Sequence, residues 1–252
     1  MIGVFDSGSG GLTVLTEIRT RLPKADLIYF GDIRNAPYGP RSKEELLSLT
    51  GNALAFLQRH GATRYVSACN SVSTSLALSL LDTLSIGQGQ IIEMVGPSVR
   101  SFKGSTERIG LVATSATIDS GIYQNAFHMI GKEVEAIAIP ELAGAIEAGA
   151  RTEEVDRIVN SALGEKTGVF DVLVLACTHY PLALESFKRE LGSSTRLYNP
   201  AVAVGEKVEE AWGASEEGTG TLRFFISQDS ETFRGLVAQF FAEGTYTIEV
   251  IE

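Results

Sequence analysis

Short apolar, β-branched runs alternate along this chain with segments in which apolar residues recur every three or four positions. The first pattern predicts buried strands, and the second predicts helices that place one face on a core. Strands alternating with helices in this way predict parallel sheets covered by helices, which is an α/β fold. The predicted strands are residues 2–5, 27–30, 65–68, 109–113, 134–139, 172–176 and 224–226, and the clearest helical stretches are 12–22, 43–60 and 118–130.

Local signals mark the ends of two of these helices. Pro23 follows the first helical stretch and stops it. Ser42 with Glu45 forms a capping box at the start of the second, which ends near Gly61.

Glycine-rich breaks predict a division of the chain into two α/β domains. A Gly/Gln-rich turn at residues 87–90 and a glycine- and proline-containing segment at 96–104 predict one boundary, and Tyr-Asn-Pro at 198–200 predicts a weaker one. We therefore expect the chain to return to its first domain at the C-terminus. The predicted ranges are 1–97 plus 205–252 for the first domain and 98–204 for the second.

The charge balance limits the partners that we expect. The chain has 252 residues and a formal net charge of −10, which repels nucleic acid and anionic membrane surfaces. The N-terminal sequence has neither the basic region nor the apolar stretch of a signal or membrane segment, so a cytoplasmic protein is expected. Only two cysteines are present, far apart in the sequence, and they predict free thiols in a reducing compartment.

Both cysteines come directly after predicted strands. Cys69 follows strand 65–68, and Cys177 follows strand 172–176. Ligands bind at the carboxyl ends of strands in open α/β sheets, and a helix N-terminus beside a thiol lowers its pKa. A lone free cysteine is more often a small core residue. Two matched placements favour a pair of reactive thiols with a lowered pKa.

The spacing of the cysteines leaves few kinds of chemistry. The sequence has no CxxC or HxxxH metal-binding spacing, and a redox pair would usually be closer together. A cysteine protease would leave the second thiol unexplained. Two thiols on opposite sides of one carbon could remove a proton and return another, which inverts the stereocentre.

Asp6 is a further candidate, because it ends the first strand and precedes a glycine-rich turn at residues 7–11. Its alternative interpretation is a simple turn or cap aspartate. The glycine run lacks the Gly-Lys-Ser/Thr of a phosphate-binding loop.

At these residues the sequence resembles the glutamate racemase family, and the likeness extends over nearly the whole chain. The two cysteine motifs, in the right order and context, are its most specific part. The matching segments are residues 6–12, 31–32, 37–39, 68–71, 113–118, 177–182 and 225–227, with Phe233.

The resemblance implies two doubly wound parallel-sheet domains that face each other across a cleft. It also implies an enzyme that racemises free glutamate without pyridoxal phosphate, metal or any other cofactor, and that supplies D-glutamate for peptidoglycan. A homodimer is expected by the same likeness.

The resemblance further implies roles for individual residues. Cys69 would deprotonate the D enantiomer and Cys177 the L enantiomer. Asp6 would assist Cys69, and His179, partnered by Glu147, would assist Cys177. The residues implied to hold the substrate are Asp6, Ser7, Pro37, Tyr38, Gly39, Asn70, Ser71, Thr114, Thr117, Thr178 and His179.

Two of these residues have ordinary structural interpretations. Glu147 could be a solvated glutamate on a helix, and Tyr38 could be a packing aromatic in a turn. The charged stretch 151–157 predicts an exposed helix face.

The sequence also departs from the family pattern. Ser71 and Val72 replace the usual threonine and alanine, residues 94–99 fit poorly, and a cysteine often found before Pro140 is absent. Three alternatives therefore stay open: a racemase for aspartate or a related acid, a catalytically inactive amino-acid-binding protein, and a thiol-redox protein. The last requires the two cysteine α-carbons within about 7 Å of each other.

Overall fold

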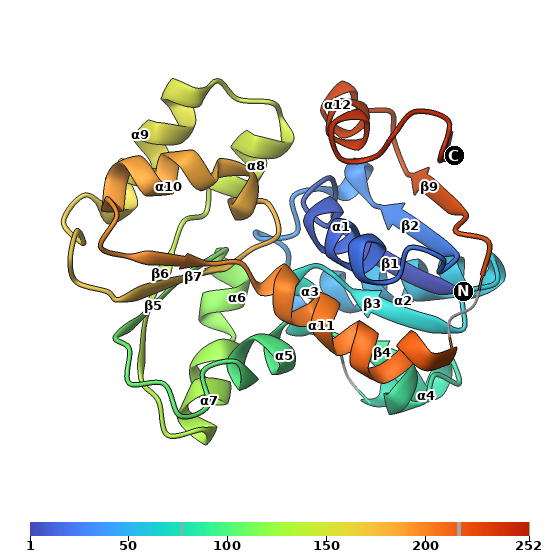
Figure 1. The fold of residues 1–252 in the computed structure, drawn as a ribbon, viewed down its shortest axis with the longest axis horizontal. Coiled ribbons are helices and arrows are strands. Elements are labelled where there is room, and N and C mark those ends of the chain that lie inside the picture. Colours follow the sequence, from blue (N-terminus) through green and yellow to red (C-terminus); the bar gives the residue numbers. More distant parts are fainter. Residues whose placement is uncertain (77, 216–217, 252) are drawn as a thin grey trace.

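The computed structural model describes residues 1–76, 78–215 and 218–251, and these form two parallel β-sheets, each flanked by helices (Figure 1). The six-stranded sheet has the order β10-β9-β2-β1-β3-β4, and the four-stranded sheet has the order β6-β5-β7-β8. The strands are β1 Ile2–Asp6, β2 Leu27–Gly31, β3 Arg64–Ser67, β4 Ile91–Ile92, β5 Ile109–Ala113, β6 Val134–Ala138, β7 Val172–Ala176, β8 Arg196–Tyr198, β9 Leu222–Ile226 and β10 Thr247–Val250.

At least one helix lies between every two successive strands. The α-helices are α1 Leu12–Arg21, α2 Lys43–Arg59, α3 Asn70–Ser73, α4 Leu78–Thr83, α5 Val95–Arg100, α6 Ser115–Asp119, α7 Ile122–Met129, α8 Leu142–Glu147, α9 Thr152–Leu163, α10 Leu184–Leu191, α11 Pro200–Trp212 and α12 Glu231–Phe240. The short 3-10 helices are η1 Ile33–Asn35, η2 Gln88–Gln90, η3 Tyr180–Ala183 and η4 Gly213–Ser215.

The six-stranded sheet is covered on both faces. Ile2 and Val4 of β1 pack on one side with α1, α11 and α12, whereas Phe5 packs on the other side with α2. We call this sheet with its helices the six-stranded lobe. Because successive side chains of a strand point to opposite faces, a strand buried on both sides reads as one continuous apolar run. This is why residues 2–5 show no alternation of apolar and polar positions.

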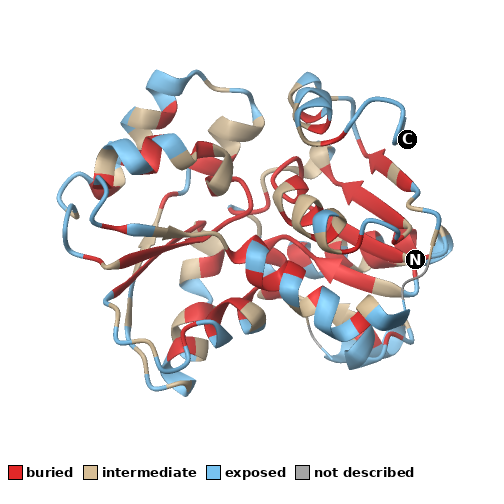
Figure 2. Ribbon diagram, viewed as in Figure 1, coloured by how far each residue is buried: buried red, intermediate tan, exposed pale blue. Residues whose placement is uncertain are grey.

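The four-stranded sheet is built on the same plan. Leu173 and Leu175 of β7 pack against α8, α9 and α10, and Val172 and Val174 pack against α5 and α7. We call this sheet with its helices the four-stranded lobe. In Figure 2 the central strands of both lobes are buried, and the helices expose their outer faces. The predicted α/β class with two doubly wound parallel sheets is confirmed.

All seven predicted strands are present, within two residues of their predicted ends. The capping box at Ser42 is also confirmed, with both of its hydrogen bonds. The single helix predicted over 118–130 is wrong, because α6 and α7 are separated at Gly121. This glycine has φ +66°, a left-handed conformation that interrupts a helix and that other residues adopt at a cost.

The sequence patterns do not indicate α11, whose start is the Tyr-Asn-Pro segment that we interpret from sequence as a break. The Asn199 side chain accepts a hydrogen bond from the Ala201 N–H, and Pro200 occupies the first turn, where its missing N–H costs nothing. The polar segment is therefore a helix cap.

Helices α5 and α11 lie where the chain passes between the lobes (Figure 1). The domain ranges stay a prediction; their boundaries near 97 and 204 fall within these two helices, and positions 77, 216, 217 and 252 of those ranges lie outside the described residues. None of the described helices is long and apolar enough to cross a membrane.

Candidate active site

The carboxyl ends of β1, β3, β5 and β7 meet at a small buried cavity between the lobes. Each of these strands leads directly into a candidate residue, as the parallel topology predicts. The cavity has a volume of about 10 Å³, which is space for the centre of about one water molecule. The residues that line it are Ser7, Pro37, Tyr38, Gly39, Cys69, Asn70, Ser71, Thr114, Ala143, Cys177, Thr178 and His179.

Cys69 contributes one wall of the cavity from the six-stranded lobe. It is 5% exposed, and its thiol donates to the Ser7 hydroxyl at 3.9 Å. Burial, together with the nearby Asp6 carboxylate, raises the pKa of Cys69 to about 12. The predicted lowering of this pKa is therefore wrong: α3 has only four residues, and the loss of hydration outweighs its N–H groups. At neutral pH Cys69 is a thiol.

Cys177 contributes the facing thiol from the four-stranded lobe, beside a buried histidine. Cys177 is 6% exposed, and its Sγ lies 3.9 Å from His179 Nδ1. His179 is 2% exposed, and its Nε2 lies 2.5 Å from Glu147 Oε2. Burial alone would lower the pKa of His179, but its hydrogen bonds to Cys177 and Glu147 raise the pKa well above the ordinary value.

Glu147 is the charged partner of that histidine. Burial opposes its ionisation, yet the pKa of Glu147 is lowered by the hydrogen bond and charge of His179 and by two hydrogen bonds from Ser9. The pair is therefore an imidazolium and a carboxylate at neutral pH. A solvated helix glutamate is ruled out, because the Glu147 side chain is only 10% exposed.

Asp6 lies behind the cavity wall and links the two lobes. Its carboxylate accepts hydrogen bonds from the Gly8 N–H at 3.0 Å and from the Thr178 hydroxyl at 3.1 Å. Burial raises the pKa of Asp6, and the positive charge of His179 opposes this shift. Asp6 thus caps its own turn, as in the alternative interpretation, and also contacts the opposite lobe.

The glycine-rich turn after Asp6 allows the two lobes to approach closely. A Cβ atom on Gly8 would lie 2.4 Å from Glu147 Oε2, and one on Gly10 would lie 2.7 Å from His179 Nδ1. Any side chain at either position would push this turn away from the Glu147–His179 pair. The glycines are explained by this approach, without a phosphate.

Hydroxyl and amide groups complete the site. The Ser71 and Thr114 hydroxyls lie 2.9 Å apart across the lobes, and Thr114 lies 3.2 Å from Thr117. Asn70 Oδ1 accepts a hydrogen bond from the Tyr123 hydroxyl at 2.6 Å. The Asn70 Nδ2 is buried and has no partner among the described residues, so it is available to donate to an anionic ligand.

Tyr38 is a packing aromatic that also lines the cavity. Its ring is buried in the six-stranded lobe, and its hydroxyl donates to Asp32 Oδ2 at 2.7 Å. Burial raises the pKa of Tyr38, and the Asp32 carboxylate raises it further.

All of the residues that we expected from the sequence are therefore brought to one place. Asp6, Thr117 and Glu147 lie behind the lining residues and reach the site through hydrogen bonds. The sequence interpretation missed Ser9, Ala143 and Tyr123, and no local pattern sets them apart from ordinary turn and helix residues. Among the described residues, no group of three or more His, Cys, Asp or Glu side chains is arranged to hold a metal ion.

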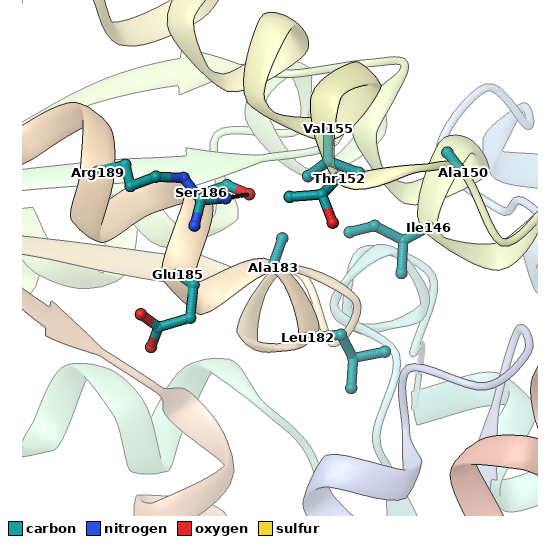
Figure 3. A pocket seen from close by; sticks show the side chains of 9 residues that line it. All are labelled: Ile146, Ala150, Thr152, Val155, Leu182, Ala183, Glu185, Ser186 and Arg189. Atoms are coloured by element: carbon teal, nitrogen blue, oxygen red, sulfur yellow. Dashed lines mark hydrogen bonds between the residues drawn. The ribbon is translucent and has the colours of Figure 1, made fainter.

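A separate, larger hollow of about 330 Å³ lies in the four-stranded lobe (Figure 3). Its walls come from α8, α9, η3 and α10, and both of its charged residues are already paired, Arg189 with Asp156 at 2.6 Å and Glu185 with Lys188 at 2.8 Å. No thiol or histidine lines it. The candidate active site is therefore the smaller cavity that holds both thiols, and not this larger hollow.

Two parallel α/β lobes that each supply one thiol to a common buried cavity define a racemase-type enzyme. A sequence profile of the family described as Asp/Glu/Hydantoin racemase matches residues 9–206, and the chain belongs to this family.

Full-length relatives agree with this assignment. The chain is 34% identical to glutamate racemase 3 of Caldanaerobacter subterraneus subsp. tengcongensis, over 100% of this chain and 95% of the relative. It matches the crystal structure of glutamate racemase isoform RacE1 from Bacillus anthracis with a TM-score of 0.86 and 30% identity, over 100% and 97% of the two chains. A glutamate racemase from Francisella tularensis in complex with D-glutamate matches with a TM-score of 0.86 and 25% identity, again over 100% and 97%.

Proposed function

We propose that this enzyme interconverts L-glutamate and D-glutamate, with Cys69 and Cys177 as the two acid/base groups. The observation that carries the proposal is that the two thiols come from different lobes, line one buried cavity and have separate supporting groups. The glutamate racemases to which the chain is similar support the choice of substrate.

The reaction in the L-to-D direction is a proton removal followed by a proton return. Cys177, as a thiolate, takes the α-proton, and the electron pair of the broken C–H bond stays on the α-carbon. The Cys69 thiol then gives its proton to the opposite face, which forms the new C–H bond and leaves Cys69 as a thiolate. Before the next turnover, Cys177 loses a proton and Cys69 regains one.

The electrostatics of the site suit these roles. The raised pKa of Cys69 keeps its proton in place for donation, and the His179 cation lies beside Cys177, where a thiolate is required. The unpartnered Asn70 Nδ2 is a donor for the substrate carboxylate, whose negative charge grows as the α-proton leaves.

Substrate entry requires the lobes to separate. A cavity of about 10 Å³ is far too small for an amino acid, so the structure represents a closed form. Closing again around the substrate would exclude water and strengthen the hydrogen bonds in the site.

The biological role follows from the product. D-glutamate would supply peptidoglycan synthesis, and we place the enzyme in the cytoplasm as a homodimer.

The proposal is tested by incubating the purified protein with L-glutamate, without added cofactor, and measuring D-glutamate by chiral chromatography. L-aspartate is assayed in parallel. Formation of D-glutamate that is abolished in both Cys69→Ala and Cys177→Ala supports the proposal. Racemisation of aspartate alone would favour the aspartate alternative, and a folded protein that racemises neither acid would favour the binding-protein alternative.

A further inference from the structure

Ser9 hydrogen-bonds to Glu147, although the sequence interpretation assigns this serine no role of its own. It lies in the turn between β1 and α1 and is 0% exposed. Its backbone N–H and its hydroxyl both donate to Glu147 Oε2, each at 2.8 Å. The same oxygen lies 2.5 Å from His179 Nε2. Three donors therefore converge on one carboxylate oxygen.

This contact joins the two lobes. Ser9 belongs to the six-stranded lobe, whereas Glu147 at the end of α8 and His179 after β7 belong to the four-stranded lobe. Because the cavity is too small for an amino acid, opening the lobes to admit a substrate would break the hydrogen bonds from Ser9, and closing them would form these bonds again. Glu147 and His179 pair within the four-stranded lobe, and Ser9 adds two hydrogen bonds to Glu147 from the six-stranded lobe.

We propose that Ser9 is a positioning residue whose N–H and hydroxyl hold the Glu147 carboxylate against His179 when the lobes close. This inference rests on the proposed function, because it concerns the groups that support Cys177. The charge on His179 beside Cys177 then depends on closure of the lobes.

The few hydrogen-bond donors around Glu147 explain why losing the Ser9 hydroxyl would change the charge of this carboxylate. Glu147 Oε1 is buried and has no partner among the described residues, so the buried charge is stabilised only through Oε2. Removing one donor from a buried charged group favours its neutral form. A proton would then pass from His179 to Glu147, and the cation beside Cys177 would be lost.

Other ionisable groups face this pair and must be considered in any pH measurement. Asp6 at the end of β1 and Tyr29 of β2 interact with Glu147, and Cys177 interacts with His179. Among the described residues, the Ser9 hydroxyl is hydrogen-bonded to Glu147 and to none of these three groups, so a change that is specific to Ser9 is separable from theirs.

The test compares Ser9→Ala with Ser67→Ala as a matched control. Ser67 in β3 is also 0% exposed, but its hydroxyl is buried without a hydrogen-bond partner among the described residues. We expect kcat/KM for glutamate to fall about tenfold in S9A, the effect of losing one hydrogen bond to a charged group, and its alkaline limb to move to lower pH. S67A should keep the wild-type value and profile.

Two further measurements separate positioning from simple stability. The imidazole of His179, followed by NMR in the substrate-free enzyme, should titrate at lower pH in S9A than in wild type. In a Glu147→Gln background, adding S9A should change kcat/KM hardly at all, because the charge that Ser9 acts on is gone. If S9A fails to fold, Ser9→Cys keeps nearly the same shape with a weaker donor, and the same shifts are expected.

The proposal would be overturned if S9A lowered kcat/KM by the same factor in the wild-type and Glu147→Gln backgrounds. It would also be overturned if the folded S9A variant kept the wild-type titration of His179. The NMR titration does not depend on turnover. If the wild-type protein does not racemise glutamate, the proposed function fails, and the role of Ser9 is still tested by that titration.

Discussion

The close approach of the glycine turn to Glu147 predicts the effect of one added methyl group. In Gly8→Ala the new Cβ would lie 2.4 Å from Glu147 Oε2, whereas ordinary contacts begin at 3.4 Å, so the turn and the carboxylate must separate by about 1 Å. Gly8 does not have a positive φ, so alanine is not excluded by its backbone conformation. The perturbation is therefore a steric one at the acid/base pair.

A displacement of this size lowers kcat strongly without unfolding the protein. Misplacing a catalytic group by about 1 Å costs on the order of 100-fold in rate, and we expect that loss in the kcat of Gly8→Ala. The contact lies between the lobes and outside both cores, so the thermal midpoint should change little. The assay is the initial rate of D-glutamate formation as a function of L-glutamate concentration, with thermal unfolding measured on the same sample.

Gly89→Ala is the matched control for this prediction, since nothing lies within 4 Å of a Cβ at Gly89. It should have wild-type kcat and stability. A folded Gly8→Ala enzyme with a kcat close to that of wild type would refute the reasoning, because the structure leaves no room for the methyl group in the closed form.

Two further predictions follow from the titrating groups of the site. In a Cys177→Ser variant, alkylation of Cys69 by iodoacetamide should accelerate about tenfold per pH unit between about pH 7 and 10 without a plateau, because the pKa of Cys69 is about 12; a plateau below about pH 9 would contradict the burial argument. The raised pKa of His179 contributes stability that is complete below the unfolded value of about 6.5 and is lost as pH rises through the folded pKa. Urea unfolding should therefore show a decline at alkaline pH that is absent in His179→Gln and retained in His128→Gln, a change at an exposed histidine; equal curves for all three proteins would contradict this.

The strands and the placement of the two thiols could be predicted from the sequence because both depend on local patterns. A buried parallel strand is a short apolar run, and its last residue lies at the edge of the sheet where ligands bind. Residues 65–68 and 172–176 show this run clearly, so the positions of Cys69 and Cys177 followed once parallel sheets were expected.

The parts that could not be predicted depend on contacts between distant segments. Glu147 is far from Ser9 in sequence and lies in the other lobe, and its burial is decided by that contact. The pKa of Cys69 depends likewise on burial between two lobes. The N-terminus of α3, a helix of four residues, could not offset the rise in pKa that this burial causes. The position of Gly121 within an apolar periodic stretch hid the break between α6 and α7.

The central claim, that two thiols act from opposite faces of the substrate, is tested most directly by the fate of the α-proton. Wild-type enzyme is given L-glutamate in D₂O and stopped early, before the product returns to the enzyme, and the two enantiomers are separated and analysed by mass spectrometry. The two-thiol account predicts that D-glutamate carries deuterium at the α-carbon while the remaining L-glutamate keeps its proton. D-glutamate that carries the original proton would show that one group both removes and returns it, and would contradict the account.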